Sequence, residues 1–219
     1  MPPFYNITFR DDAQEVIERA EPWLAGGAID YLDKNLTEDM IGVEFGGGGS
    51  TLWLCKRLKL LYTFEADHNW SIGLLDTISK SVELRKKWVL HFVNCTWHVN
   101  LDGSVSETKG FWNKHIDELS REEQSAMETA FLEIGLPTKV DVALVDGAVR
   151  YLSLDVVAKW MRENPKMLAV VDNTEGRYGE RANEIFPDTH ERVDFADSQK
   201  ERISRGADWG QTSIWVPKS

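Results

Sequence analysis

The chain has 219 residues, 42% of them hydrophobic, and a formal net charge of −11 at pH 7. This length suits one α/β domain with a substantial core. The acidic balance argues against a nucleic-acid partner, because such a protein needs clustered basic side chains to displace counterions from phosphates. No apolar run reaches the roughly 18 residues of a membrane span, and the first residues do not resemble a secretion signal. We therefore expect a single cytoplasmic domain over residues 1–219 that acts on a small molecule, with no membrane partner.

The hydrophobic pattern predicts seven strands, at residues 40–45, 61–65, 87–93, 140–145, 167–171, 190–195 and 212–216. Helical patterns precede or separate most of these strands, at about residues 11–20, 26–36, 50–58, 69–84 and 152–162. Alternating strands and helices predict an α/β fold with a doubly wound parallel sheet. The last two strands have little helix between them, which favours an antiparallel pair at one edge.

One connection is longer than a crossover between neighbouring parallel strands needs. Residues 100–138 form this insertion, and residues 122–136 within it have apolar positions at helical spacing. The polar stretch at residues 101–110 is either a lid over a bound ligand or a loop in solvent. The two cysteines, Cys55 and Cys95, are too few for a disulfide framework and are expected in the core.

A glycine-rich turn follows the first predicted strand. Gly46 to Gly49 come directly after that strand, and Glu65 ends the next one, nineteen positions after Gly46. Glycine tolerates the positive φ of a tight strand-to-helix turn and allows a ligand to lie against bare backbone. An acid at the end of the second strand is placed to accept hydrogen bonds from a ribose. The sequence therefore predicts a site for a nucleoside-containing cofactor.

The residues around this turn distinguish between nucleoside cofactors. The nicotinamide fingerprint G-x-G-x-x-G requires a small third residue where this chain has Thr51. Glu44, two residues before the first glycine, would repel a pyrophosphate, whereas S-adenosylmethionine carries two cationic groups and no phosphate. The pattern E-x-G-x-G-x-S/T, followed by an acid after the next strand, resembles class I S-adenosylmethionine-dependent methyltransferases.

That resemblance implies a Rossmann-like, mostly parallel, seven-stranded sheet with an antiparallel edge strand. It also implies cofactor contacts from the glycine turn, from the acid after the second strand, and from residues after the second, third and fourth strands. These candidate cofactor-binding residues are Glu44, Gly46, Gly48, Ser50, Thr51, Glu65, Ala66, Thr96, Trp97 and Asp146.

A second set of polar residues ends the fourth and fifth predicted strands. Asp146 follows one strand, and Asp172 and Asn173 follow the other. This set resembles cation-dependent O-methyltransferases of the catechol and caffeoyl-CoA types. The resemblance implies that these three residues hold Mg²⁺ or another divalent cation, which binds the acceptor hydroxyls and lowers their pKa. The lysine base of those families is absent, and Arg150 follows instead; it can anchor an anion but is a poor base.

A less characterised group of bacterial methyltransferases is similar over nearly the whole chain. Its members share a V-D-G…R segment, a D-N-S/T…Y segment and a late strand that begins T-S-I. Asp146-Gly147 with Arg150, Asp172-Asn173-Thr174 with Tyr178, and Thr212-Ser213-Ile214 follow these patterns. This resemblance names no substrate.

The predicted function is methyl transfer from S-adenosylmethionine to a small molecule, at a hydroxyl oxygen. Candidate catalytic residues are Asp146, His98, whose ordinary pKa suits a general base, and Tyr178. A surface histidine is the alternative for His98. A non-catalytic cofactor-binding protein and a nicotinamide-dependent oxidoreductase are the alternative functions. The acceptor, its accepting atom, the base, the use of a metal and the oligomeric state stay open, a homodimer included.

Overall fold

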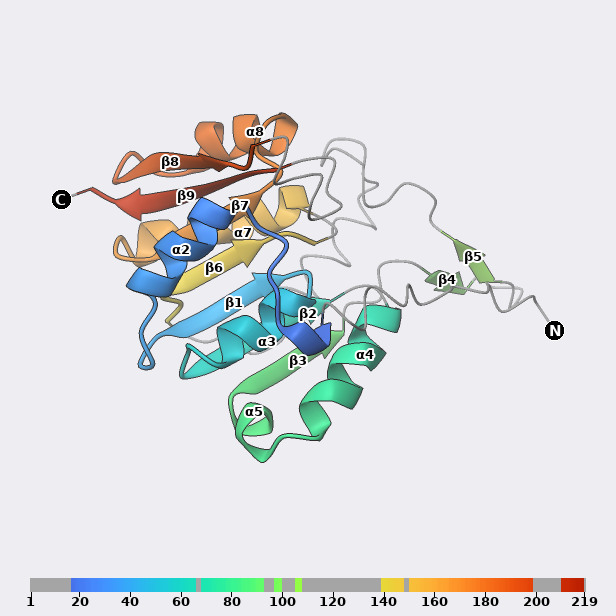
Figure 1. Ribbon diagram of the computed structural model, residues 1–219. Coiled ribbons are helices and arrows are strands. Elements are labelled where there is room, and N and C mark those ends of the chain that lie inside the picture. The colour runs from blue at the N-terminus through green and yellow to red at the C-terminus, as the bar shows by residue number, and fades with distance from the viewer. Residues whose placement is uncertain are drawn as a thin grey trace.

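The computed structural model describes residues 17–65, 68–92, 97–99, 105–107, 139–147, 150–198 and 210–218. A seven-stranded sheet lies between two layers of helices, with strand order β3-β2-β1-β6-β7-β9-β8 (Figure 1). Its strands are β1 Ile41–Phe45, β2 Leu60–Glu65, β3 Trp88–Phe92, β6 Val142–Val145, β7 Leu168–Asp172, β8 His190–Ala196 and β9 Gln211–Pro217. All seven strands predicted from the sequence are present, within one or two residues of the predicted bounds.

Helices cover both faces of this sheet. They are α2 Gly26–Asn35, α3 Gly49–Cys55, α4 His68–Ser79, α5 Val82–Lys86, α7 Arg150–Glu163 and α8 Arg177–Ile185. Residues of α2, α3 and α4 share one hydrophobic core with the sheet, and residues of α7 and α8 share the other. Along β6, Ala143 and Val145 enter one core while Val142 and Leu144 enter the other. Central strands buried on both faces explain the nearly continuous apolar runs in the sequence.

The single helix predicted at residues 69–84 is wrong, because the structure divides it into α4 and α5. The break lies at Ser81, which has an extended backbone with φ −117° and ψ 117°. The Ser81 hydroxyl accepts a hydrogen bond from the Leu84 N–H at 3.3 Å and so caps α5. Serine side chains compete in this way with helix hydrogen bonds, and they favour helix starts over helix interiors.

The sheet is mostly parallel, as predicted, and its antiparallel strand is β9. This strand pairs antiparallel with β7 on one side and with the edge strand β8 on the other. Two further short strands, β4 Trp97–Val99 and β5 Val105–Glu107, pair antiparallel in a separate sheet. The helix predicted at residues 122–136 lies outside the described residues, and the choice between lid and loop for residues 101–110 stays a prediction.

Two narrower expectations concern membrane spans and cysteines. Within the described ranges, no helix combines the length and the apolar character that crossing a membrane requires. Cys55 is buried and unpaired in the core of α2, α3 and α4, as expected. Cys95 lies outside the described residues.

The strand order brings four carboxyl ends together. Strands β2, β1, β6 and β7 are consecutive neighbours and run parallel. Ligands in open α/β sheets bind beyond the carboxyl ends of the strands. The acids predicted for the site stand at or near these four ends, and this edge therefore carries the candidate site.

Candidate cofactor and acceptor site

The glycine turn after β1 touches the turn after β6. Gly46 has a φ of +97°, as the sequence predicted for a tight turn. A Cβ on Gly46 would lie 2.4 Å from the Gly147 Cα, and a Cβ on Gly147 would lie 2.5 Å from the Gly46 Cα. Real side chains never approach backbone so closely. The glycine of the V-D-G segment is therefore explained by this contact.

Glu44 is fully buried beneath the glycine turn. Its Oε1 accepts a hydrogen bond from the Thr63 hydroxyl at 2.7 Å, and its Oε2 accepts one from the Ser50 hydroxyl at 3.1 Å. Burial raises the pKa of Glu44 to about 7, although hydrogen bonds from neighbouring hydroxyls oppose the rise. In the structure this side chain joins β1 to β2 and to the start of α3, and its contact with the methionine part of a cofactor stays a prediction.

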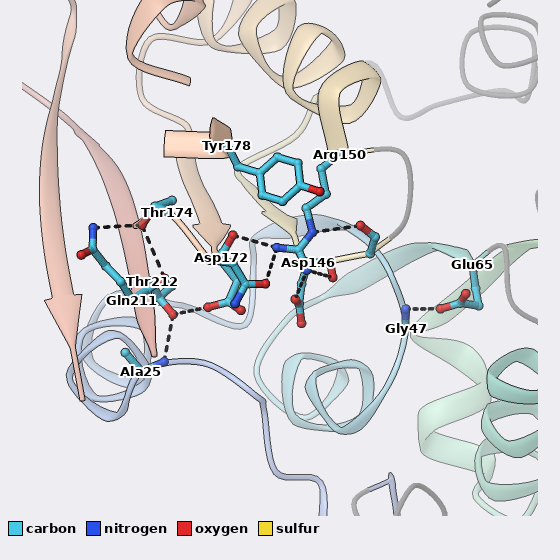
Figure 2. Close-up of polar contacts among 12 residues, drawn as sticks. Ala25, Gly47, Glu65, Asp146, Arg150, Asp172, Thr174, Tyr178, Gln211 and Thr212 are labelled. Carbon is cyan, nitrogen blue, oxygen red and sulfur yellow. Dashed lines mark hydrogen bonds and ion pairs between the residues drawn. The ribbon is translucent and has the colours of Figure 1, made fainter. Parts of the chain in front are cut away.

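Glu65, at the end of β2, holds the same turn from the other side. Its Oε2 accepts a hydrogen bond from the Gly47 N–H at 2.6 Å (Figure 2). The Thr51 hydroxyl accepts one from the Gly48 N–H at 2.9 Å. The side chains of Ser50 and Thr51 therefore both make hydrogen bonds inside the turn, and their contacts with a cofactor stay predictions.

Arg150, at the start of α7, joins the turn after β6 to the end of β7. Its Nε donates to the Gly147 carbonyl at 3.0 Å, and its Nη2 donates to the Asp146 carbonyl at 2.7 Å and to Asp146 Oδ1 at 3.0 Å. Its Nη1 donates to the Asp172 carbonyl at 2.8 Å and to Asn173 Oδ1 at 2.6 Å (Figure 2). All five donors of the guanidinium are thus in use. Sequence reasoning missed this role, for which the only signal was the V-D-G…R spacing.

Two acids, Asp146 and Asp172, lie on either side of this arginine. Burial and the charge of Asp146 raise the pKa of Asp172 to about 8. Burial raises the pKa of Asp146 to about 6, with Arg150 opposing the rise and the charges of Glu44 and Glu65 adding to it. Asp146 therefore interacts with each of the other three acids, Glu44, Glu65 and Asp172.

The strand β9 contributes a residue that the sequence did not single out for the site. The Thr212 hydroxyl donates to Asp172 Oδ1 at 2.6 Å and accepts from the Ala25 N–H at 2.9 Å (Figure 2). The next residue, Ser213, bonds the Thr174 hydroxyl at 2.5 Å. The T-S-I pattern thus links the end of β7 to β9 and to the segment before α2.

Of the remaining predicted site residues, the structure describes the side chain of Tyr178 only. Tyr178, on α8, lies with its ring 5.0 Å from the Arg150 guanidinium carbon, and its hydroxyl accepts from Arg177 Nη2 at 3.1 Å. Trp97 and His98 lie in β4, and their side chains are not among those described. Ala66 and Thr96 lie outside the described residues. The roles assigned to these residues therefore stay predictions.

The three residues predicted to hold a divalent cation are brought together. Asp146, Asp172 and Asn173 all lie around Arg150, and each offers a side-chain oxygen that already accepts a hydrogen bond. Among the described residues, no three His, Cys, Asp or Glu side chains form a group with metal-binding geometry.

Comparisons with known proteins show what this architecture is. No protein-family model matches the chain, and no curated protein is recognisably similar. A protein from Klebsiella pneumoniae proposed to be an O-methyltransferase superposes with a TM-score of 0.57 at 15% identity, over 95% of this chain and 89% of that one. The O-methyltransferase TomG from Streptomyces achromogenes, solved with S-adenosylmethionine, gives 0.56 at 14% identity, over 95% and 91%.

An rRNA methylase from Streptococcus thermophilus is also similar, with a TM-score of 0.53 at 11% identity, over 88% of this chain and 95% of that one. At such low identity these likenesses concern the fold. The fold predicted from the resemblance, that of class I S-adenosylmethionine-dependent methyltransferases, is therefore confirmed. Because methylases of different acceptors share it, the fold alone does not select an acceptor.

Proposed function

We propose that this protein is an S-adenosylmethionine-dependent methyltransferase that methylates a small molecule at a hydroxyl oxygen. The observation that carries the proposal is the gathering of Glu44, Glu65, Asp146 and Asp172 at neighbouring strand ends around the glycine turn. Such a group of acids suits a cofactor with an ammonium and a sulfonium and without phosphate. It would repel the pyrophosphate of a nicotinamide cofactor, so the oxidoreductase alternative is disfavoured.

The cofactor would lie across the glycine turn, between the ends of β2 and β6. Glu65 would accept hydrogen bonds from the ribose hydroxyls, as its place at the end of β2 favours. The backbone of Gly46 and Gly48 would lie against the methionine part, with Asp146 beside it. Ala66, Thr96 and Trp97 would border the adenine.

The chemistry requires mainly alignment, because the bound cofactor supplies a methyl group that is already activated. The acceptor oxygen must lie in line with the methyl carbon and must lose its proton. Asp146 is the proposed proton acceptor, because its side chain is 23% exposed and burial raises its pKa from the ordinary value towards neutral pH. His98 and Tyr178 are the other candidate groups for orienting the acceptor.

The decisive first measurement is calorimetric titration of the purified protein with S-adenosylhomocysteine, with NADH as a control. We expect micromolar binding of S-adenosylhomocysteine and no binding of NADH. Tight binding of NADH, or of neither nucleoside, would contradict the proposal.

Replacement of Glu65 by alanine tests the ribose contact. We expect Glu65→Ala to weaken S-adenosylhomocysteine binding about 10- to 100-fold, because a charged hydrogen bond contributes roughly 1.5–3 kcal/mol. The matched control is Glu191→Ala, which removes an exposed glutamate from β8 and should leave affinity unchanged. Equal affinities for the two variants would remove Glu65 from the cofactor site.

Turnover separates the enzyme from the non-catalytic alternative. Formation of S-adenosylhomocysteine from S-adenosylmethionine, measured across hydroxylated small molecules and an RNA control, is expected only with a small molecule. The net charge of −11 supports that choice of acceptor. Binding without turnover across a broad panel would favour a binding protein on the same fold.

A further inference from the structure

In each residue predicted to bind a divalent cation, one side-chain oxygen accepts a hydrogen bond from within the protein. Asp146 Oδ1 and Asn173 Oδ1 accept from Arg150 at 3.0 and 2.6 Å, and Asp172 Oδ1 accepts from the Thr212 hydroxyl at 2.6 Å. A Mg²⁺ ion demands ligand oxygens at 2.0–2.1 Å in near-octahedral geometry. Asn173 has a single side-chain oxygen, so a cation held by all three residues would have to displace the guanidinium from it, and it would bind Asp146 through the carboxylate that pairs with the same guanidinium.

The guanidinium of Arg150 is not easily displaced. Its other three hydrogen bonds go to backbone carbonyls, those of Asp146, Gly147 and Asp172, which belong to the ends of β6 and β7. Its side chain is 13% exposed, and the Tyr178 ring lies 5.0 Å from its guanidinium carbon. Swinging the arginine away would leave several partly buried carbonyls without donors, which proteins strongly disfavour.

Charge gives a second reason against a cation at this place. The positive guanidinium lies within 3.0 Å of the oxygens of Asp146 and Asn173, so a dication bound to the same atoms would stand beside a fixed positive charge. In a partly buried site such repulsion is only weakly screened. The donor set as it stands therefore does not fit a divalent cation.

We propose that Arg150 takes the place of the divalent cation, so that the acceptor site works without Mg²⁺ or Ca²⁺. Arg150 is a positioning residue: it holds the turn after β6 against the end of β7, an arrangement that a shared metal would otherwise impose. Its five donors are all used, so it offers none to the acceptor. The link to methyl transfer rests on the proposed function, whereas the exclusion of a cation rests on the contacts alone.

One consequence concerns the acceptor. A divalent cation can bind two neighbouring hydroxyls of the acceptor at once. A guanidinium whose five donors are all in use cannot. The acceptor therefore needs only one hydroxyl, placed beside the exposed part of Asp146.

The test is titration of the protein with Mn²⁺. Binding is measured by electron paramagnetic resonance, as the decrease of the signal from free Mn²⁺. The wild type should not bind Mn²⁺ at sub-millimolar concentration. Arg150→Met removes the charge and frees the oxygens of Asp146 and Asn173, so we expect it to bind Mn²⁺ at least about tenfold more tightly than the wild type. Arg150→Lys keeps a positive charge and should behave as the wild type does.

The matched control is Arg181→Met, which removes an arginine that pairs with Asp155 between α8 and α7, away from the strand ends. It should leave Mn²⁺ binding unchanged. Adding Asp172→Asn to Arg150→Met should abolish the gained affinity and so locate the ion. Far-UV circular dichroism establishes that each variant is folded.

Micromolar Mn²⁺ binding by the wild type that Asp172→Asn removes would overturn the proposal, and this arm does not depend on the folding of Arg150→Met. A folded Arg150→Met with no gain in Mn²⁺ affinity would overturn it as well. Titration with S-adenosylhomocysteine in the absence of metal reports on the proposed function separately. If the protein did not bind S-adenosylhomocysteine, the proposed cofactor would be refuted, but the conclusion from Mn²⁺ binding would still stand.

Discussion

Replacing Gly46 by alanine is expected to cost at least about 4 kcal/mol of unfolding free energy and to leave little folded protein. Two effects add at this position. The φ of +97° is strained for any residue with a Cβ, and the new Cβ would lie 2.4 Å from the Gly147 Cα and 2.5 Å from the Gly147 nitrogen. The obstacle is backbone at the end of β6, so no side-chain rotation relieves it.

Urea unfolding, together with the yield of soluble protein, measures this effect. Gly176→Ala is the control, because a Cβ at Gly176, just before α8, meets nothing within 4 Å. It should change the unfolding free energy by less than about 1 kcal/mol. If Gly46→Ala were as stable as Gly176→Ala, the contact between the two turns would not exist as described.

Replacing Glu44 by glutamine is expected to remove a pH dependence of stability from the wild type. From pH 5 to pH 8, the unfolding free energy of the wild type should fall by about 2–3 kcal/mol relative to that of the variant. Glutamine keeps the site filled, since its carbonyl can accept from Thr63 and its amide can donate to the Ser50 hydroxyl. It cannot ionise, and it therefore avoids the burial of a charge.

The sign follows from the raised pKa. Burial raises the pKa of Glu44 from an ordinary value of 4.5 to about 7, so between these values the folded chain binds more protons than the unfolded one. The stability that the buried proton contributes is therefore fully present below pH 4.5. It is lost as the pH rises through about 7.

Urea titrations at pH 5 and pH 8 of the wild type, Glu44→Gln and Glu191→Gln measure this shift. Glu191 is exposed on β8, so its variant should follow the wild type at both pH values. The comparison removes the contributions of the acids that do not interact with Glu44, because these titrate alike in all three proteins. Parallel behaviour of Glu44→Gln and the wild type would show that Glu44 ionises in the folded protein without penalty.

The local part of the site could be read from the sequence. Gly46 and Glu65 are where the strand and turn patterns placed them, because a tight strand-to-helix turn and a strand-end acid are local features. The break at Ser81 was missed because a serine in a helical pattern gives no sign of whether its hydroxyl will cap a new helix.

The hydrogen bonds of Arg150 could not be predicted from the local sequence. The sequence showed an arginine that could not serve as a base, and that inference agrees with its five hydrogen bonds. Its partners Asp172 and Asn173 lie at the end of β7, and they reach Arg150 only because β6 and β7 pair in parallel register. Thr212 was missed for the same reason, since its contact with Asp172 depends on the antiparallel pairing of β9 with β7.

The sequence by itself determined the α/β class, the seven strands, the glycine turn and the acids at the strand ends. Periodicity and turn chemistry act over a few residues, so a single chain records them directly. Only the tertiary structure decided that Gly46 touches Gly147, that Glu44 is buried with a raised pKa, and that Arg150 binds side-chain oxygens of two residues expected to hold a metal, Asp146 and Asn173. Burial, electrostatic fields and contacts between strands arise when distant segments meet, and none of them is a property of a local stretch of sequence.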